Sequence, residues 1–171
     1  SENTSIKKPR YFVKKIPVKK IAYSAVVAAM YFALTVLLQP ISYGPVQLRL
    51  SEALVMLPYI MPESILGITI GCALANCFSV FSVYDAVFGT LATLVAGILT
   101  SRIKNRFLAG IPPVLVNALV LPLMWYLLGV ETAYYISLLS IIASESLVVY
   151  CIGIPLTALI QKKVPSLVTR R

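Results

Sequence analysis

The sequence contains no histidine among its 171 residues. This absence removes the side chain that most often binds a metal ion or acts as a general base. Only three cysteines are present, and their odd number and spacing match no metal or redox motif, so we interpret them as small packing residues. No Gly-x-x-x-x-Gly-Lys-Ser/Thr phosphate loop occurs either, so the chain is not expected to hydrolyse ATP. These absences argue against an enzyme, a metal site and a bound cofactor.

Charged residues are also scarce. They make up 12% of the chain, whereas hydrophobic residues make up 59%. A soluble domain has about 25% charged and about 45–50% apolar residues. The apolar residues form long continuous runs rather than the ~10-residue alternating segments of a membrane barrel. We therefore predict an all-α integral membrane protein.

Six apolar segments are recognised, at 21–39, 50–60, 64–80, 84–101, 112–128 and 134–160. The second is shorter than the ~17–25 residues that a helical span needs. It either crosses steeply as a partly re-entrant segment or is extended by the loop at 40–49. Because that loop contains Pro and Gly, we expect a structured turn rather than a helix, placed as a lid over an outward-facing pocket.

The fifteen Lys and Arg residues are almost confined to three places. Seven lie in 1–20, three in 101–106 and four in 162–171, and only Arg49 lies elsewhere. Six crossings put all three clusters on one side, which the positive-inside rule makes cytoplasmic, so nucleic-acid binding is not needed to explain them. We thus predict a basic cytoplasmic segment at 1–20, a six-helix transmembrane domain at 21–161 and a basic cytoplasmic tail at 162–171.

Glu145 lies in the middle of the last apolar segment, with no Lys or Arg near it in sequence. A carboxylate at the centre of a membrane helix costs about 2.5–3.5 kcal/mol on insertion scales, so a chain that carries one is expected to use it. At a rise of about 1.5 Å per residue, Glu145 and Asn117 both lie roughly 16 Å from the outer ends of their helices. Glu145 therefore either lines a ligand pocket or pairs with a group on another helix.

Further candidates for the same pocket lie within the spans or at their outer ends: Arg49, Glu52, Asn76, Asp85, Tyr84 and Trp125. Each has a structural alternative. Asp85 is placed to cap a helix, Arg49 and Glu52 are spaced to pair with each other, and the asparagines suit hydrogen bonds between helices. The aromatic residues are equally typical of a membrane–water interface belt. If they share one pocket, three carboxylates and one Arg favour a ligand that is cationic or rich in N–H donors.

Ala25, Ala29 and Ala33 repeat every four residues in the first segment. This spacing forms a smooth ridge on a helix, where a second helix can pack closely. The second helix belongs either to this chain or to a partner. A partner that supplies energy is favoured, because the chain has no ATPase motif and no clear internal repeat of the secondary-transporter kind. The alternative is a self-standing proton-coupled transporter that uses Glu145 as its proton site.

Several strings occur in an order that is similar to one known family. They are Gln47-Leu48-Arg49-Leu50-Ser51-Glu52-Ala53-Leu54, Gly71-Cys72 with Ala75-Asn76, Asp85-Ala86-Val87-Phe88-Gly89-Thr90-Leu91-Ala92-Thr93, Pro112-Pro113-Val114-Leu115-Val116-Asn117-Ala118, and Glu145 in the last segment. Over about residues 20–163 they resemble the QueT group of substrate-binding S components from energy-coupling factor (ECF) transporters. Ser144 departs from the pattern, since Gly is expected before the glutamate.

The resemblance implies a six-helix S component in a bacterial cell membrane, with both termini cytoplasmic. It implies an ECF transmembrane coupling subunit that docks at Ala25, Ala29 and Ala33, and two separate ATPase subunits. The implied ligand is a queuosine precursor (preQ1, preQ0 or queuine), all of which are 7-deazaguanines. The substrate-binding residues expected from the pocket and the resemblance together are Glu145, Asp85, Asn117, Asn76, Arg49, Glu52, Tyr84 and Trp125.

Overall fold

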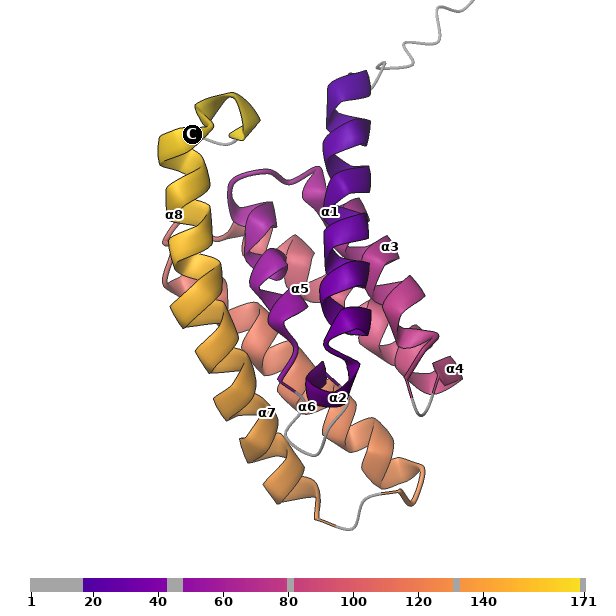
Figure 1. Cartoon of the computed structure of the whole chain (residues 1–171). Helices are drawn as coiled ribbons and strands as arrows, with labels where there is room; N and C mark the ends of the chain where they lie inside the picture. The colour runs from indigo at the N-terminus through magenta and orange to yellow at the C-terminus, as the bar shows by residue number, and fades with distance from the viewer. Residues whose placement is uncertain (1–16, 43–47, 80–81, 131–132, 170–171) are drawn as a thin grey trace, which may run out of the picture.

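The computed structural model describes residues 17–42, 48–79, 82–130 and 133–169, and every regular element in these ranges is helical. In chain order the elements are α1 (Val18–Leu37), α2 (Gln39–Ser42), η1 (Leu50–Tyr59), α3 (Ser64–Asn76), α4 (Ser82–Tyr84), η2 (Asp85–Gly89), α5 (Thr90–Arg102), η3 (Leu108–Gly110), α6 (Ile111–Leu127), α7 (Tyr134–Val148), η4 (Val149–Gly153), α8 (Ile154–Lys163) and η5 (Pro165–Leu167), as Figure 1 shows. The elements η1, η3 and η5 are 3₁₀ helices, whereas η2 and η4 are π turns. The all-helical prediction is confirmed for the described residues.

Continuous stacking of these elements gives helical stretches that match the predicted apolar segments. α4, η2 and α5 follow one another without a break, as do η3 and α6, and α7, η4 and α8. Three stretches, Val18–Leu37, Leu108–Leu127 and Tyr134–Lys163, are long and apolar enough to cross a membrane. The expectation of a non-helical turn from residue 40 was wrong for its first residues, which belong to α2. Pro40 fits there because proline is tolerated in the first turn of a helix.

Large apolar side chains cover the outside of the bundle in stripes spaced by four residues. The exposed stripes are Leu66, Ile70 and Leu74 on α3, Leu91, Val95 and Leu99 on α5, and Leu115, Leu119 and Leu123 on α6. The buried faces of α3 and α5 carry small and polar residues instead, among them Gly71, Cys72, Ala92 and Thr93. Apolar residues outside and polar residues inside are the distribution that suits lipid as the surrounding solvent.

The central element of the bundle is η1, the second predicted segment. Its residues 51–58 are all buried, and it packs against α1, α3, α5, α7, η4 and α8. Gly153 in η4 permits this packing, because a Cβ there would lie 2.8 Å from Met56 Cγ and 3.1 Å from the Ala53 carbonyl oxygen. With a 3₁₀ rise of about 2.0 Å per residue, the ten residues of η1 extend for about 20 Å. This is less than the ~30 Å hydrocarbon core of a bilayer.

α1 and α3 pack backbone to backbone. A Cβ on Gly67 would lie 2.3 Å from the Ser24 carbonyl oxygen, and a Cβ on Gly71 would lie 2.6 Å from the Ala28 carbonyl oxygen. Real Cβ atoms do not approach so closely, so only glycine fits at both positions. The intramolecular contact therefore uses the Ser24 and Ala28 side of α1, one position round the helix from the predicted alanine ridge.

Contacts between distant segments gather the basic residues at one end of the bundle. Lys20 Nζ lies 3.4 Å from Glu63 Oε1, the Tyr59 hydroxyl donates to the Lys104 carbonyl (3.1 Å), Arg106 donates to the Gln161 side chain, and the Thr169 hydroxyl donates to Glu63 Oε1. Figure 1 shows the start of α1 and the end of α8 at this same end. The described parts of the three basic clusters thus lie together.

Glu63 makes the stability of the fold depend on pH. Partial burial raises the pKa of its carboxyl, but the hydrogen bond from Thr169 and the charge of Lys20 outweigh it and hold the pKa below its usual value. The ionised Glu63 carboxylate therefore stabilises the fold at pH values above the pKa of about 4.3 that a glutamate has in the unfolded chain. This contribution is lost as the pH falls through the lower pKa of the folded state. We expect Glu63→Gln to lower the thermal midpoint by about 2 °C at neutral pH, and the difference to vanish near pH 3.

The measurement is thermal unfolding of the detergent-solubilised protein across this pH range. Lys20→Gln should reproduce part of the loss at neutral pH. Lys19→Gln, at the neighbouring exposed position, is the matched control and should leave the profile unchanged. An equal effect of both lysine substitutions would show that general surface charge, rather than the contact with Glu63, is responsible.

Candidate functional site

Two buried glutamates from distant parts of the chain meet at one asparagine. Asn117 Nδ2 on α6 lies 3.1 Å from Glu145 Oε1 on α7 and 3.4 Å from Glu52 Oε2 on η1. The side chain of Glu52 is 1% exposed, that of Asn117 3% and that of Glu145 5%. The Tyr31 hydroxyl on α1 donates to Glu52 Oε1. We call Tyr31, Glu52, Asn117 and Glu145 the central cluster.

The packing of η1 explains how the central cluster forms. Glu52 enters the core because η1 is enclosed by helices, including α1 and α7, and α7 lies against α6. Asn117 and Glu145 were predicted at similar depths in their helices, and the structure brings them into hydrogen-bond contact. Glu145 therefore does pair with a group on another helix, which was the structural alternative to a ligand. This hydrogen bond uses only one of its two carboxylate oxygens.

Several buried polar atoms of the bundle have no hydrogen-bond partner among the described residues. Among them are Glu145 Oε2, Asp85 Oδ1, Trp125 Nε1, Ser42 Oγ and Ser79 Oγ. A buried polar atom without a partner costs about 1–3 kcal/mol, and more when it is charged. Two of these atoms are carboxylate oxygens, which only accept hydrogen bonds when ionised. The arrangement is therefore suited to a ligand that brings N–H groups.

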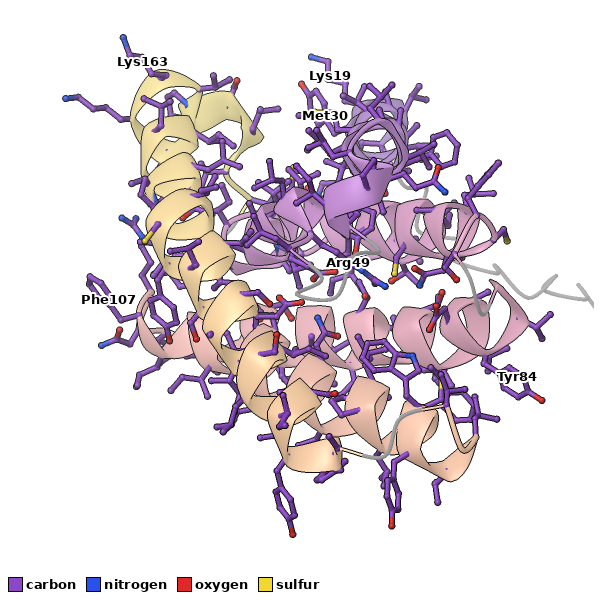
Figure 2. All side chains as sticks on the ribbon, turned by 60° about the horizontal axis from the view of Figure 1, so that its bottom comes forward. Lys19, Met30, Arg49, Tyr84, Phe107 and Lys163 are labelled. Carbon is purple, nitrogen blue, oxygen red and sulfur yellow. The ribbon has the colours of Figure 1, made fainter. Side chains whose placement is uncertain are left out.

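Arg49 supplies positive charge to the same region. Its side chain is buried, its Nε lies 3.4 Å from the Ser42 carbonyl oxygen, and Figure 2 shows it in the middle of the bundle with helices on both sides. The guanidinium interacts electrostatically with Glu52, Asp85 and Glu145. Three carboxyl groups thus interact with a single Arg.

The amide nitrogen of Asn76 is bonded to the backbone of Asp85. It therefore holds Asp85 in place and is not directed to a ligand. Its Nδ2 lies 2.9 Å from the Asp85 carbonyl oxygen and 3.3 Å from Cys72 Sγ. A π turn interrupts the regular i→i−4 bonds of a helix, and Asp85 begins the π turn η2, where the Asn76 amide supplies a donor. A Cβ on Gly89 would lie 2.6 Å from this Nδ2 atom, so glycine leaves room for the amide. The predicted role of Asn76 as a hydrogen-bond link between helices accounts for this nitrogen.

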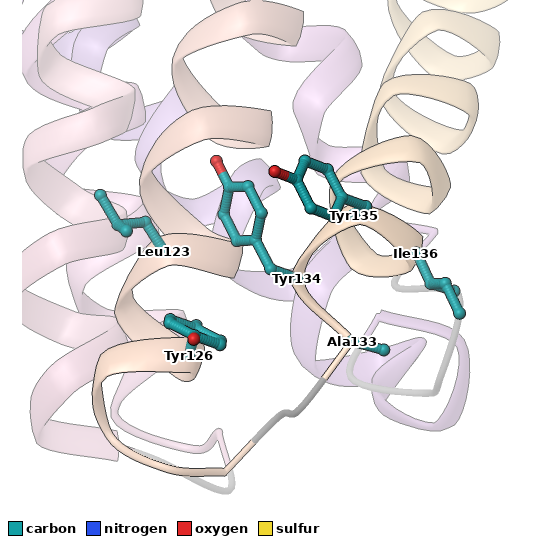
Figure 3. A pocket seen from close by; sticks show the side chains of 6 residues that line it. All are labelled: Leu123, Tyr126, Ala133, Tyr134, Tyr135 and Ile136. Atoms are coloured by element: carbon teal, nitrogen blue, oxygen red, sulfur yellow. The ribbon is translucent and has the colours of Figure 1, made fainter.

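The two aromatic candidates, Trp125 and Tyr84, lie in different environments. Trp125 is buried, whereas the Tyr84 side chain is 48% exposed and lies at the edge of the bundle in Figure 2, so the structure does not bring it to the central cluster. Tyr126 and Tyr134 stack edge to face with centroids 6.2 Å apart, and Tyr135 continues the row at 5.4 Å. These three rings line a surface hollow of about 540 Å³ where α6 meets α7, as Figure 3 shows. Exposed tyrosines at helix ends are typical of an interface belt.

Comparison with known proteins assigns the chain to a family. The QueT transporter model matches residues 21–162. This chain belongs to the QueT transporter family. "Queuosine precursor transporter QueT" of Lactococcus lactis subsp. cremoris (strain MG1363) is 39% identical over 97 residues, which cover 56% of this chain and 57% of that relative. The match thus spans a little over half the length of the relative. No solved structure matches.

The predicted QueT family is confirmed, and it is a family of transporters. The site residues remain a prediction from geometry and sequence. The expected lid falls mainly on residues 43–47, which lie outside the described residues. Leu48 N donates to the Ile41 carbonyl oxygen at 3.1 Å, so the described ends of that loop lie close together.

Sequence reasoning missed Tyr31, which is 1% exposed and contacts Glu52. It lies on α1 four residues before Thr35, whose hydroxyl lies 2.6 Å from Ser51 Oγ. A tyrosine in the middle of a membrane helix needs a partner for its hydroxyl, so the spacing of these two polar residues was an available signal. It predicts which face of α1 looks inward.

We expect Tyr31→Phe to destabilise this QueT family member by about 1.5–3 kcal/mol, because the buried Glu52 carboxylate loses a charge-assisted hydrogen bond. Thermal unfolding of the solubilised protein measures the effect. Tyr23→Phe is the matched control, since Tyr23 lies on the same helix but is only partly buried against the apolar core. Equal midpoints for Tyr31→Phe and the unmodified protein would contradict the role given to the hydroxyl.

The three alanines of the predicted ridge differ in their exposure. Ala25 and Ala29 are exposed and line a groove of about 990 Å³ between α1 and α3, together with Ala28, Phe32, Leu66 and Ile70. Ala33 is half-buried and does not line the groove. Two of the three predicted alanines therefore remain accessible for a partner helix.

Proposed function

We propose that this chain is the membrane-embedded, high-affinity substrate-binding subunit of an ATP-driven ECF importer and that it binds a queuosine precursor at the central cluster. The observation that carries the proposal is Glu145 Oε2, a buried carboxylate oxygen in the middle of a membrane-length helix, with no hydrogen-bond partner among the described residues. The cost of such an atom is removed when a ligand donates an N–H group to it. The Lactococcus relative, which is named as a queuosine precursor transporter, supports this class of ligand.

A 7-deazaguanine matches the polar atoms of the site. Its N1–H and N2 amine lie side by side, and one carboxylate accepts both, a role that we assign to Glu145. Trp125 Nε1, which has no hydrogen-bond partner among the described residues, is our proposed donor for the base carbonyl O6. We assign Asp85 to a positively charged 7-substituent, because its backbone is held by Asn76 and its Oδ1 likewise has no described partner. Asn117 then orients Glu145 from one side.

The proposed topology has six crossings with both termini in the cytoplasm. Its support is the gathering of the basic residues at the end of the bundle that carries Lys20, Glu63 and Gln161. The central element η1 is the shortest crossing, and protein rather than lipid surrounds it. The proposed binding pocket opens toward the opposite end of the bundle.

The proposed partners are an ECF transmembrane coupling subunit and two ATPase subunits. Small side chains at Ala25 and Ala29 allow a partner helix to approach α1 closely in the groove beside α3. A large side chain at Ala29 should therefore weaken assembly while leaving ligand binding intact. The two effects should separate because Ala29 is exposed in the groove, whereas Tyr31 lies about 200° further round α1 and is buried against Glu52.

Two measurements test the proposal. Calorimetry of the purified chain should show binding of preQ1 and queuine, with guanosine as a control that carries a bulky ribose. Uptake into proteoliposomes should require the coupling subunit, the ATPases and ATP. Uptake by the chain alone, driven by a proton gradient, would instead identify a self-standing proton-coupled transporter. Absence of binding to every queuosine precursor would overturn the assignment.

A further inference from the structure

We infer that the ligand-free central cluster holds one proton between Glu52 and Glu145, and that a cationic ligand replaces it, so the site selects an amine-bearing ligand and releases a proton on binding. This inference rests on the proposed function, since it concerns the same site. It adds a preference within the class of 7-deazaguanines. It also adds a proton to the binding equilibrium.

The geometry of Asn117 is the first reason. Its single amide nitrogen lies within hydrogen-bond reach of both carboxyl groups, at 3.1 Å from Glu145 and 3.4 Å from Glu52. Two carboxylates so close together, with both side chains buried, do not readily hold two negative charges. The partners of the two groups are unequal. Glu52 accepts from both Tyr31 and Asn117, whereas Glu145 Oε2 has no partner among the described residues, so we place the proton on Glu145.

The charge of the surroundings is the second reason. The charged and titratable groups that interact with the pair are Tyr31 on α1, Arg49 before η1 and Cys72 on α3. Asp85 on η2 interacts with the same Arg49. Tyr31 donates its hydroxyl hydrogen and Cys72 accepts from Thr93, so Arg49 is the cation that these groups provide. With all three carboxyls ionised, one guanidinium would face three negative charges.

Exchange of a proton for an ammonium group leaves the charge of the site unchanged. The O–H bond of the Glu145 carboxyl breaks, its proton leaves to water, and the carboxylate accepts the N–H donors of the base. The ammonium of the ligand meets the remaining negative charge. A ligand with a neutral 7-substituent brings no charge to replace the proton, so Glu145 stays protonated and accepts only one of the two N–H donors of the base. PreQ1 and queuine carry an amine, whereas preQ0 carries a neutral nitrile.

Calorimetry of the full-length purified protein in two buffers of different ionisation enthalpy, such as phosphate and Tris, counts the protons exchanged. At a pH near 6.5 we expect preQ1 to release close to one proton and preQ0 to release none. Over the range in which the site holds its proton, preQ1 affinity should rise about tenfold per pH unit. The preQ0 affinity should be lower and independent of pH.

Glu145→Gln should abolish the proton release, because the amide keeps the shape of a protonated carboxyl and does not titrate. Glu63→Gln, the same substitution at the basic end of the bundle, should leave the release unchanged. If Glu145→Gln does not fold, the proton release and affinity of preQ1 and preQ0, measured on the unmodified protein, still test the inference. Binding of both ligands with equal affinity and no proton release would overturn this inference alone. Binding of neither would overturn the proposed function as well.

Discussion

Glu145→Gln is expected to weaken binding of preQ1 and queuine by about 100-fold or more. The carboxylate is proposed to accept two N–H groups of the base, and hydrogen bonds to a charged group contribute about 1.5–3 kcal/mol each. Glutamine offers one acceptor oxygen and presents an N–H₂ group where the second acceptor was. At least about 3 kcal/mol is lost in this way, which corresponds to roughly 100-fold in dissociation constant. Calorimetry with both ligands measures it.

The substitution separates binding from folding. Asn117 donates to Glu145 Oε1, and a glutamine oxygen accepts the same hydrogen bond, so the contact between α6 and α7 is retained. We expect an unfolding midpoint close to that of the unmodified protein. Glu63→Gln is the control for the change of net charge and should bind normally. Unchanged affinity for both ligands in Glu145→Gln would remove this glutamate from the binding site.

Gly67→Ala is expected to lower the thermal midpoint by roughly 6–12 °C. The new Cβ would lie 2.3 Å from the Ser24 carbonyl oxygen, so α1 and α3 must move apart. Overpacking of this kind costs about 3 kcal/mol when backbone has to shift, and each kcal/mol lowers the midpoint by about 2–4 °C for a chain of this size. Ligand affinity should fall too, because the displaced α1 carries Tyr31, which donates to Glu52.

Gly97→Ala is the matched control within α5. There the added Cβ would lie 3.0 Å from Ile68 Cδ1, the end of a flexible side chain that is able to rotate away. Both glycines lie inside helices, where alanine is intrinsically favoured by about 1 kcal/mol. Gly97→Ala should therefore unfold close to the normal midpoint. Similar losses for the two variants would mean that helix geometry, rather than the approach of α1 to α3, sets the effect.

The helices and the membrane setting could be predicted because they depend on local hydropathy. Long apolar runs and the scarcity of charge predict helices in lipid, and the basic clusters predict which ends lie together. Glu145 stood out for the same reason, since one carboxylate in such a run has few explanations. Its contact with Asn117 was only suggested by equal depth, and the bond itself depends on how α6 and α7 pack.

Other features depend on packing that no local pattern encodes. The partner of Glu52 is Tyr31 on another helix, and nothing in the string around Glu52 indicates it. Tyr84 and Trp125 are both aromatic residues near helix ends, yet one is exposed and the other buried. The helix type of η1 was also not predicted, because a 3₁₀ helix of ten residues is rare and is held here by the surrounding helices.

The 3₁₀ pitch of η1 sets the direction of Glu52 within the bundle. With three residues per turn, side chains three apart are eclipsed, so Glu52, Val55 and Pro58 follow one line down the helix. At the 3.6 residues per turn of an α-helix, each step of three would rotate the next side chain by about 60° away from that line. The winding of one short helix thus gives an acid the same direction as two apolar core residues, whereas Arg49 precedes the helix in extended backbone.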